Sequence, residues 1–260
     1  METAVVRSTG LAYEERGTGF PVVFVHGLTF NRGTWRPIID RLAERYRCIA
    51  VDLPGHGESA GLPRSWQDLG GQLAAFITGL EIERPVLVGH SHGGGLVSML
   101  AATYPVAGVV NVDQSLDVIP FVRMAQQMAP ALRGPNFAEA FEPIRRSIGV
   151  EMLPEPLRSS TLAAQTVRQD LVLAHWSDML ERSPEELQAM IDQMARQIRV
   201  PYLAVFGHAL SDEERTRLRD RLPTLELEEW PDRGHMVHLM EPERFADRVA
   251  AFLTRCEEAL

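Results

Sequence analysis

Residues 85–95 constrain the fold of this chain more than any other stretch. They read Pro-Val-Leu-Val-Gly-His-Ser-His-Gly-Gly-Gly, in which a short apolar run leads through Gly-x-Ser-x-Gly into a helical pattern. An abrupt turn from a buried strand into a helix forces Ser91 into a strained backbone conformation and exposes its hydroxyl. Gly89 and Gly93 suit this turn because the backbone passes close to neighbouring elements there. We therefore predict that Ser91 is a nucleophile, the alternative being a glycine-rich turn that simply starts a helix.

A serine hydroxyl needs a base to take its proton, so a histidine from elsewhere in the chain is expected beside it. His235 is the strongest candidate, because it follows Gly234 directly after an apolar strand pattern and precedes the last helical pattern. We expect that loop to stand at the carboxyl edge of the sheet, alongside the Ser91 turn. His238, three residues later, is a rival, and a surface loop histidine is the structural alternative.

The rest of the chain alternates short apolar runs with amphipathic patterns, which is typical of a mostly parallel sheet with helices on both faces. Strand patterns fall at residues 3–7, 11–16, 22–25, 47–51, 85–88, 106–112, 201–206 and 225–230, the first two forming a hairpin. Helical patterns fall at residues 35–45, 66–80, 93–104 and 242–253, and a further helix starts at Ser211. The sequence thus predicts an α/β fold built on an eight-stranded, mostly parallel sheet.

Residues 114–199 have a different character. They carry no strand pattern, and their helical periodicity is broken by prolines. Six of the ten methionines lie in this stretch. We predict that residues 114–199 form a helical insertion between two parts of one core, residues 1–113 and 200–260.

Charge and cysteine usage limit the classes of partner. A net charge of −9 argues against nucleic acid, which calls for a basic face. Two cysteines, Cys48 and Cys256, make neither a disulfide framework nor a C-x-x-C metal site. Because the sequence shows neither a signal-peptide pattern nor a membrane-spanning apolar run, we expect a soluble cytoplasmic protein that acts on a small molecule without a membrane partner. The sequence leaves the oligomeric state open.

Taken together, these motifs resemble the α/β-hydrolase superfamily in their order and spacing. The resemblance rests on His26-Gly27, the Asp-Leu-Pro-Gly-His-Gly-Glu-Ser loop at residues 52–59, the turn at residues 89–93 and Gly234-His235. It extends along the whole chain, with residues 114–199 in the position of the variable helical cap. The resemblance implies a catalytic triad and an oxyanion hole formed by the backbone N–H groups of Leu28 and His92.

The sequence offers two candidates for the acid of such a triad. Asp113 closes the strand pattern at residues 106–112, and some relatives, such as many haloalkane dehalogenases, are similar in carrying the acid there. Asp212 lies after the strand pattern at residues 201–206, but it resembles a residue of a first helical turn, where acidic side chains are favoured by the helix dipole. We therefore predict Asp113 as the acid and retain Asp212 as the alternative.

These features predict a serine esterase that cleaves a small to medium, rather apolar carboxylic ester, lactone or thioester through an acyl-enzyme. We expect no cofactor and no metal, since His235-x-x-His238 lacks the helical His-Glu-x-x-His pattern. The same residues are compatible with a C–C hydrolase, a perhydrolase, a cofactor-free oxygenase or cyclase, or a non-catalytic ligand receptor.

Overall fold

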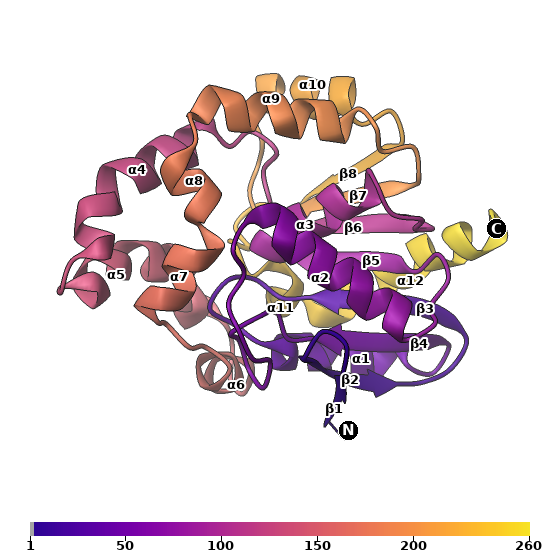
Figure 1. Ribbon diagram of the computed structural model, residues 1–260. Coiled ribbons are helices and arrows are strands. Elements are labelled where there is room, and N and C mark those ends of the chain that lie inside the picture. The colour runs from indigo at the N-terminus through magenta and orange to yellow at the C-terminus, as the bar shows by residue number, and fades with distance from the viewer. Residues whose placement is uncertain (1–2) are drawn as a thin grey trace.

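One sheet of eight strands forms the centre of the protein (Figure 1), and the computed structural model describes residues 3–260. The strands are β1 (Thr3–Val6), β2 (Leu11–Arg16), β3 (Phe20–Val25), β4 (Tyr46–Val51), β5 (Val86–His90), β6 (Gly108–Val112), β7 (Tyr202–Phe206) and β8 (Leu225–Glu229). Their spatial order is β1-β2-β4-β3-β5-β6-β7-β8. Strand β2 pairs antiparallel with β1 and β4, and the remaining neighbours are parallel. The predicted α/β fold is therefore confirmed.

Helices cover both faces of the sheet, because alternate residues of a strand point to opposite faces. In β3, Val23 and Val25 belong to one buried cluster, whereas Val22 and Phe24 belong to the other. The first cluster includes side chains of two helices, α2 (Trp66–Gly79) and α3 (His92–Ala101). The second includes side chains of α1 (Arg36–Leu42) and α12 (Pro242–Glu258). Figure 1 shows these two pairs of helices on opposite sides of the sheet.

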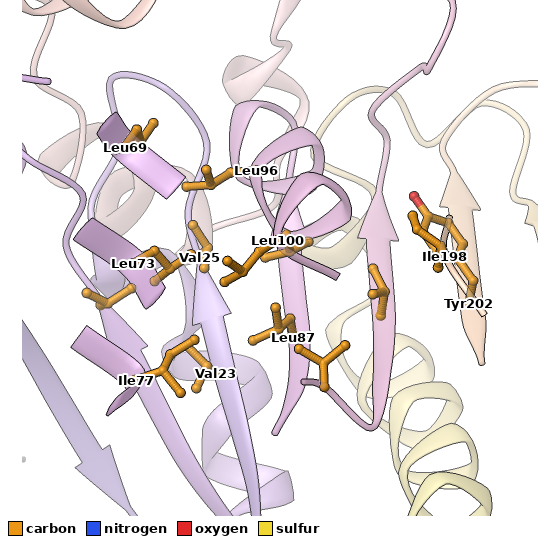
Figure 2. Close-up of a cluster of buried hydrophobic side chains, with 14 of the residues drawn as sticks. Val23, Val25, Leu69, Leu73, Ile77, Leu87, Leu96, Leu100, Ile198 and Tyr202 are labelled. Carbon is orange, nitrogen blue, oxygen red and sulfur yellow. The ribbon is translucent and has the colours of Figure 1, made fainter. Parts of the chain in front are cut away.

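The packing of α2 follows from its sequence period. Leu69, Leu73 and Ile77 are spaced by four residues, so they lie on one face of the helix. Figure 2 shows these three side chains directed toward Val23 and Val25 of β3. Burying side chains of this kind contributes about 1.5–3 kcal/mol each, which fixes the helix against the sheet.

Residues 114–199 contain helices only, in the part of the chain that the structure describes. These are α4 (Ile119–Arg133), α5 (Phe137–Ser147), the 3-10 turn η2 (Val150–Met152), α6 (Leu157–Ala163), α7 (Gln169–His175), α8 (Ser177–Glu181) and α9 (Pro184–Ala195). Pro130 and Pro143 lie inside α4 and α5 without ending them, whereas Pro184 begins α9. Among residues 3–260, no helix is long and apolar enough to cross a membrane.

The remaining helices lie close to their predicted positions. The 3-10 turn η1 (Arg32–Trp35) precedes α1. Helix α10 (Asp212–Arg221) starts after Ser211, whose side chain accepts a hydrogen bond from the Glu214 N–H in a capping box. Two details differ from the sequence pattern: α12 continues to Glu258, and a short helix, α11 (Val237–Met240), precedes it.

The turn between β5 and α3 has the strained conformation predicted from Gly-x-Ser-x-Gly. Ser91 has φ 52° and ψ −123°, a backbone conformation that residues other than glycine rarely adopt. A Cβ atom on Gly89 would lie 2.2 Å from the Gly93 carbonyl oxygen, and one on Gly93 would lie 2.4 Å from the Val25 carbonyl oxygen. Both positions therefore exclude any side chain, and close packing holds the turn in place.

His238 lies in the hydrophobic core next to this turn. It is fully buried, and its ring lies at a tilt against those of Trp35 and His90. Neither of its nitrogens has a hydrogen-bond partner among residues 3–260. Burial lowers the pKa of His238 to about 3, with the nearby His235 acting in the same direction. The ring is therefore neutral in the folded protein at ordinary pH, and it does not line the cavity described below.

The backbone strain at Ser91 predicts a stability difference between two variants that both lack the hydroxyl. Ser91→Gly should have a free energy of unfolding about 1 kcal/mol higher than Ser91→Ala. Glycine relieves backbone strain of about 1–3 kcal/mol at this position, and this gain exceeds the cost of its larger conformational entropy in the unfolded chain. Urea denaturation of the two variants measures the difference. An alanine variant as stable as the glycine variant would contradict the strained conformation.

The burial of His238 predicts a pH dependence of stability. Its pKa is about 6.5 in an unfolded chain and lower in the folded protein, so only the unfolded state gains a proton just below pH 6.5. The free energy of unfolding should therefore fall with decreasing pH below about 6.5, and this one residue should contribute about 1.4 kcal/mol per pH unit. Urea denaturation at several pH values should give a shallower slope for His238→Phe. Equal slopes for the two proteins would show that His238 is not kept neutral.

Candidate active site

The loops that follow the parallel strands bring the predicted residues to one edge of the sheet. Ser91 directly follows β5 and Asp113 directly follows β6, two strands that pair side by side. Gly207 follows β7, and His235 lies in the loop after β8. Because parallel strands end at the same edge, residues separated by more than 140 positions meet there.

Asp113 and His235 form a hydrogen bond. The distance between Asp113 Oδ2 and His235 Nδ1 is 2.7 Å, so the imidazole donates from Nδ1 to the carboxylate. The other carboxylate oxygen, Oδ1, accepts a hydrogen bond of 2.8 Å from the Gly207 N–H. The Asp113 side chain is only 5% exposed, whereas that of His235 is 27% exposed and lines a cavity. The carboxylate thus holds the ring by its Nδ1 atom, and the ring lines the cavity.

The carboxylate of Asp113 is strongly held in its charged form. Burial opposes ionisation, but contacts with His208, His235 and the Gly207 N–H outweigh it and hold the pKa of Asp113 well below its ordinary value. His208 Nδ1 lies 3.4 Å from Asp113 Oδ1, and this contact raises the pKa of His208 above its ordinary value. Asp113 therefore carries a negative charge that can stabilise a protonated imidazole at His235.

Asp212, the alternative acid, lies elsewhere. It is the first residue of α10, its side chain is fully exposed, and it pairs with Arg215 at 2.8 Å. Asp212 thus lies in the first turn of a helix, as its sequence context predicted, and it does not contact His235.

Two buried histidines beside the site are occupied by backbone contacts. His26 Nδ1 donates to the Gly27 carbonyl oxygen, and its Nε2 accepts from the Leu53 N–H at 3.0 Å. His56 Nδ1 donates to the Pro54 carbonyl oxygen, and its Nε2 accepts from the Thr29 N–H at 3.1 Å. Through these contacts the two rings tie the loops after β3 and β4 together.

His92 contacts a helix of the insertion. Its Nε2 lies 3.0 Å from Nδ1 of His175, whose own Nε2 donates to the Pro54 carbonyl oxygen at 3.0 Å. Because that carbonyl can only accept, His175 Nδ1 is the acceptor and His92 Nε2 is the donor. Burial lowers the pKa of His175 to about 4 and lowers that of His92 well below its ordinary value. Both rings are therefore neutral, and they join α7 to the turn that carries Ser91.

Two backbone N–H groups near Ser91 lack a hydrogen-bond partner among residues 3–260. His92 is the first residue of α3, so its N–H has no partner within the helix. The N–H of Leu28 makes no hydrogen bond with the described residues 3–260. A Cβ on Gly27 would lie 3.4 Å from Ser91 Cβ, so the loop that carries Leu28 lies directly against the serine. Two backbone N–H groups without a partner among residues 3–260 are thus carried by segments adjacent to Ser91.

Ser91 and His235 line one cavity of about 940 Å³. Its walls are mostly apolar, with methionine and aromatic side chains from α4, α5, α8 and α9. Arg123, Arg145 and Arg146, which belong to α4 and α5, form ion pairs with glutamates and do not line it. Among residues 3–260, no group of three or more His, Cys, Asp or Glu side chains is arranged to hold a metal ion.

Sequence reasoning did not identify His175 and His208. His175 lies in a helix 83 residues after its partner His92, and no motif surrounds it. His208 follows Gly207 at the end of β7, and its contact with Asp113 appears only in the structure.

The comparisons with known proteins point in one direction. The chain is 28% identical to 2-succinyl-6-hydroxy-2,4-cyclohexadiene-1-carboxylate synthase of Serratia proteamaculans, covering 89% of this chain and 92% of that protein. It is also 28% identical to pimeloyl-[acyl-carrier protein] methyl ester esterase of Pectobacterium carotovorum, covering 93% of this chain and 98% of that protein. A solved structure of a thermophilic esterase from Thermogutta terrifontis matches with a TM-score of 0.76 and 25% identity, covering 95% of this chain and 93% of that one. The sequence profile of the alpha/beta hydrolase family matches residues 22–248, so this chain belongs to the alpha/beta hydrolase family.

Proposed function

We propose that this protein is a serine hydrolase that cleaves an uncharged, mostly apolar carboxylic ester, lactone or thioester through an acyl-enzyme. The observation that carries the proposal is the 2.7 Å hydrogen bond between Asp113 and His235, beside a cavity that Ser91 also lines. A buried carboxylate behind an imidazole that faces a serine is the arrangement that serine hydrolysis needs.

The proposed reaction begins with attack by Ser91. Its Oγ forms a bond to the carbonyl carbon of the substrate while His235 Nε2 takes the hydroxyl proton. The electron pair of the C=O bond moves onto the carbonyl oxygen, which accepts hydrogen bonds from the N–H groups of Leu28 and His92. Such donors contribute about 3–4 kcal/mol each to the stabilisation of the transition state.

The intermediate then collapses and the leaving group departs. The carbonyl re-forms, the bond to the alcohol or thiol breaks, and His235 gives its proton to the leaving atom. A water molecule next attacks the acyl-enzyme as His235 takes one of its protons. The acid is released when the bond to Ser91 breaks and the proton returns to the serine oxygen. Throughout, Asp113 holds the Nδ1 proton of His235 and stabilises the ring while it is charged.

The charge of the substrate follows from the cavity walls. Arg182 is the one arginine or lysine among the described residues that line the cavity, and it is paired with Asp178 at 2.7 Å. A carboxylate or phosphate group on the substrate would lack a free cation. We therefore infer that the group held in the cavity is neutral.

Helices α4–α9 are proposed to act as a cap over residues 1–113 and 200–260. They supply much of the apolar lining and thereby exclude water from the acyl-enzyme. The esterase names of two similar proteins support ester hydrolysis. The synthase name of a third is the reason to test other chemistry as well.

Labelling with a fluorophosphonate probe tests the nucleophile. Wild-type protein should be labelled and should hydrolyse p-nitrophenyl esters, whereas Ser91→Ala should show neither property, because the attacking oxygen is gone. The melting temperature of each protein is the control for folding. If wild-type protein is neither labelled nor active, Ser91 is not activated, and a non-catalytic ligand receptor becomes the better description.

A pair of variants tests the acid. Asp113→Asn should lower kcat for p-nitrophenyl esters by about 10³–10⁴-fold, because an amide cannot hold the Nδ1 proton or stabilise the imidazolium. Asp212→Asn, at an exposed position remote from His235, is the matched control and should leave kcat within about twofold. Steady-state kinetics on folded samples measures both. The opposite ranking would assign the acid to Asp212.

A further inference from the structure

The cavity at Ser91 extends along helix α3. Its lining includes Ser91 and His92 at the beginning of α3 and also Thr103 and Tyr104 beyond the end of that helix. Helix α3 has ten residues with a rise of about 1.5 Å per residue, so its two ends lie about 15 Å apart. A rounded chamber at the nucleophile would not extend to both ends of α3. The cavity therefore continues as a groove that leads away from the serine.

Three helices form the walls of this groove. From α2 the lining residues are Trp66, Gln67, Gly70, Gly71 and Ala74, of which the last three are small. Ala74 follows Gly70 by four positions and Gly71 by three, so these three residues share one side of the helix. From α9 the lining residues are Leu187, Met190, Ile191 and Met194, which also share one face. From α3, Gly95 and Met99 form the floor. Figure 1 shows α2 beside α3, with α9 above them.

The small residues of α2 leave room for the groove and for its floor. A Cβ added to Gly70 would lie 2.3 Å from Met99 Cε, so glycine makes room there for the Met99 side chain. A Cβ added to Gly71 would meet no atom within 4 Å, so this exposed position is open. Opposite, Met190 is 42% exposed although it is a large apolar side chain, which leaves hydrophobic surface uncovered along the groove. Methionine is flexible and polarisable, so it suits contact with an occupant of variable shape.

The chemistry of the walls identifies the occupant. Arg182 and Asp178 neutralise each other, and Asp117 is paired with Arg217 at 2.7 Å, so the charges along the lining are already compensated. An apolar groove that begins at a nucleophile calls for a hydrocarbon chain attached to the carbonyl under attack. Each leaflet of a bilayer's hydrocarbon core is about 15 Å thick and is filled by one extended fatty chain. A groove of about 15 Å can therefore hold an extended chain of this length.

We propose that the groove between α2, α3 and α9 binds the acyl chain of a long-chain fatty ester or thioester whose carbonyl lies at Ser91. This inference rests on the proposed serine hydrolase function and extends the substrate beyond the small to medium esters expected from the sequence. The wall residues set the chain length, and the uncovered strip beside Met190 contacts the distal part of the chain.

Two matched pairs of variants test the groove. Ala74→Trp places a large ring in it, and Ala75→Trp places the same ring on the exposed side of the same helix, outside the lining. Met190→Glu introduces a charge at a partly exposed wall position, with Ala189→Glu as its neighbour outside the lining. Because Met190 and Ala189 are both exposed, neither change should endanger folding.

The readout is the ratio of kcat/KM for p-nitrophenyl dodecanoate to that for p-nitrophenyl acetate. Wild-type protein should prefer dodecanoate by at least about tenfold, because each buried methylene adds to binding. Ala74→Trp and Met190→Glu should each lower the ratio at least about tenfold, whereas both control variants should keep the wild-type ratio. A preference for acetate, or equal ratios within each pair, would overturn the proposal.

A binding measurement separates this inference from the proposed function. Parinaric acid methyl ester, a straight-chain ester that fluoresces in apolar surroundings, should bind Ser91→Ala, which cannot cleave it. Adding Ala74→Trp to that variant should weaken binding at least about tenfold, and adding Ala75→Trp should not. If Ser91 is not labelled by fluorophosphonate, the hydrolase proposal fails. The binding of the parinaric ester to the three variants then still tests whether the groove holds a hydrocarbon chain. If the ester binds all three proteins equally, the groove proposal fails even though the hydrolase stands.

Discussion

The carboxylate of Asp113 joins the ends of three neighbouring strands, and the geometry of the site depends on it. It follows β6, accepts a hydrogen bond from the Gly207 N–H after β7, and accepts another from His235 after β8. A buried carboxylate without such donors would cost several kcal/mol, so both contacts are needed for the charge to persist. The same two contacts fix the loop after β7 and the ring of His235 relative to each other.

The turn that carries Ser91 and the lining of the cavity differ in rigidity. At the turn between β5 and α3, Gly89 and Gly93 pack backbone against backbone, leaving no room for even a methyl group. Along the cavity, Met99, Met190 and Met194 offer flexible side chains. Reacting groups need positions fixed to within about 0.5 Å, whereas a hydrocarbon chain gains binding energy from any close apolar contact. The division of residue types matches these two demands.

Much of the fold was predictable because its signals are local. The apolar runs gave all eight strands, and the capping pattern of Ser211 and Glu214 indicated that Asp212 begins a helix. Asp113 could be proposed as the acid because it ends a strand at the edge where Ser91 was expected. These inferences need only the period of side chains and the direction of a parallel sheet.

The contacts that shape the cavity could not be obtained in this way. The pairing of His92 with His175 depends on how α7 lies against the core, and no local pattern encodes that placement. Pro130 and Pro143 were expected to interrupt helices, yet α4 and α5 continue through them. The groove along α3 arises because α2 and α9 both present one face to it, which only the assembled structure reveals.

The pair formed by His92 and His175 also has a consequence for proton movement. The hydrogen bonds run in one direction, from His92 to His175 and from His175 to the Pro54 carbonyl oxygen. A carbonyl oxygen has no proton to pass on, so this chain of imidazoles ends without an outlet. His26 and His56 likewise donate to carbonyl oxygens. These hydrogen bonds all end at carbonyl oxygens, so this cluster of rings beside the serine does not form a proton wire.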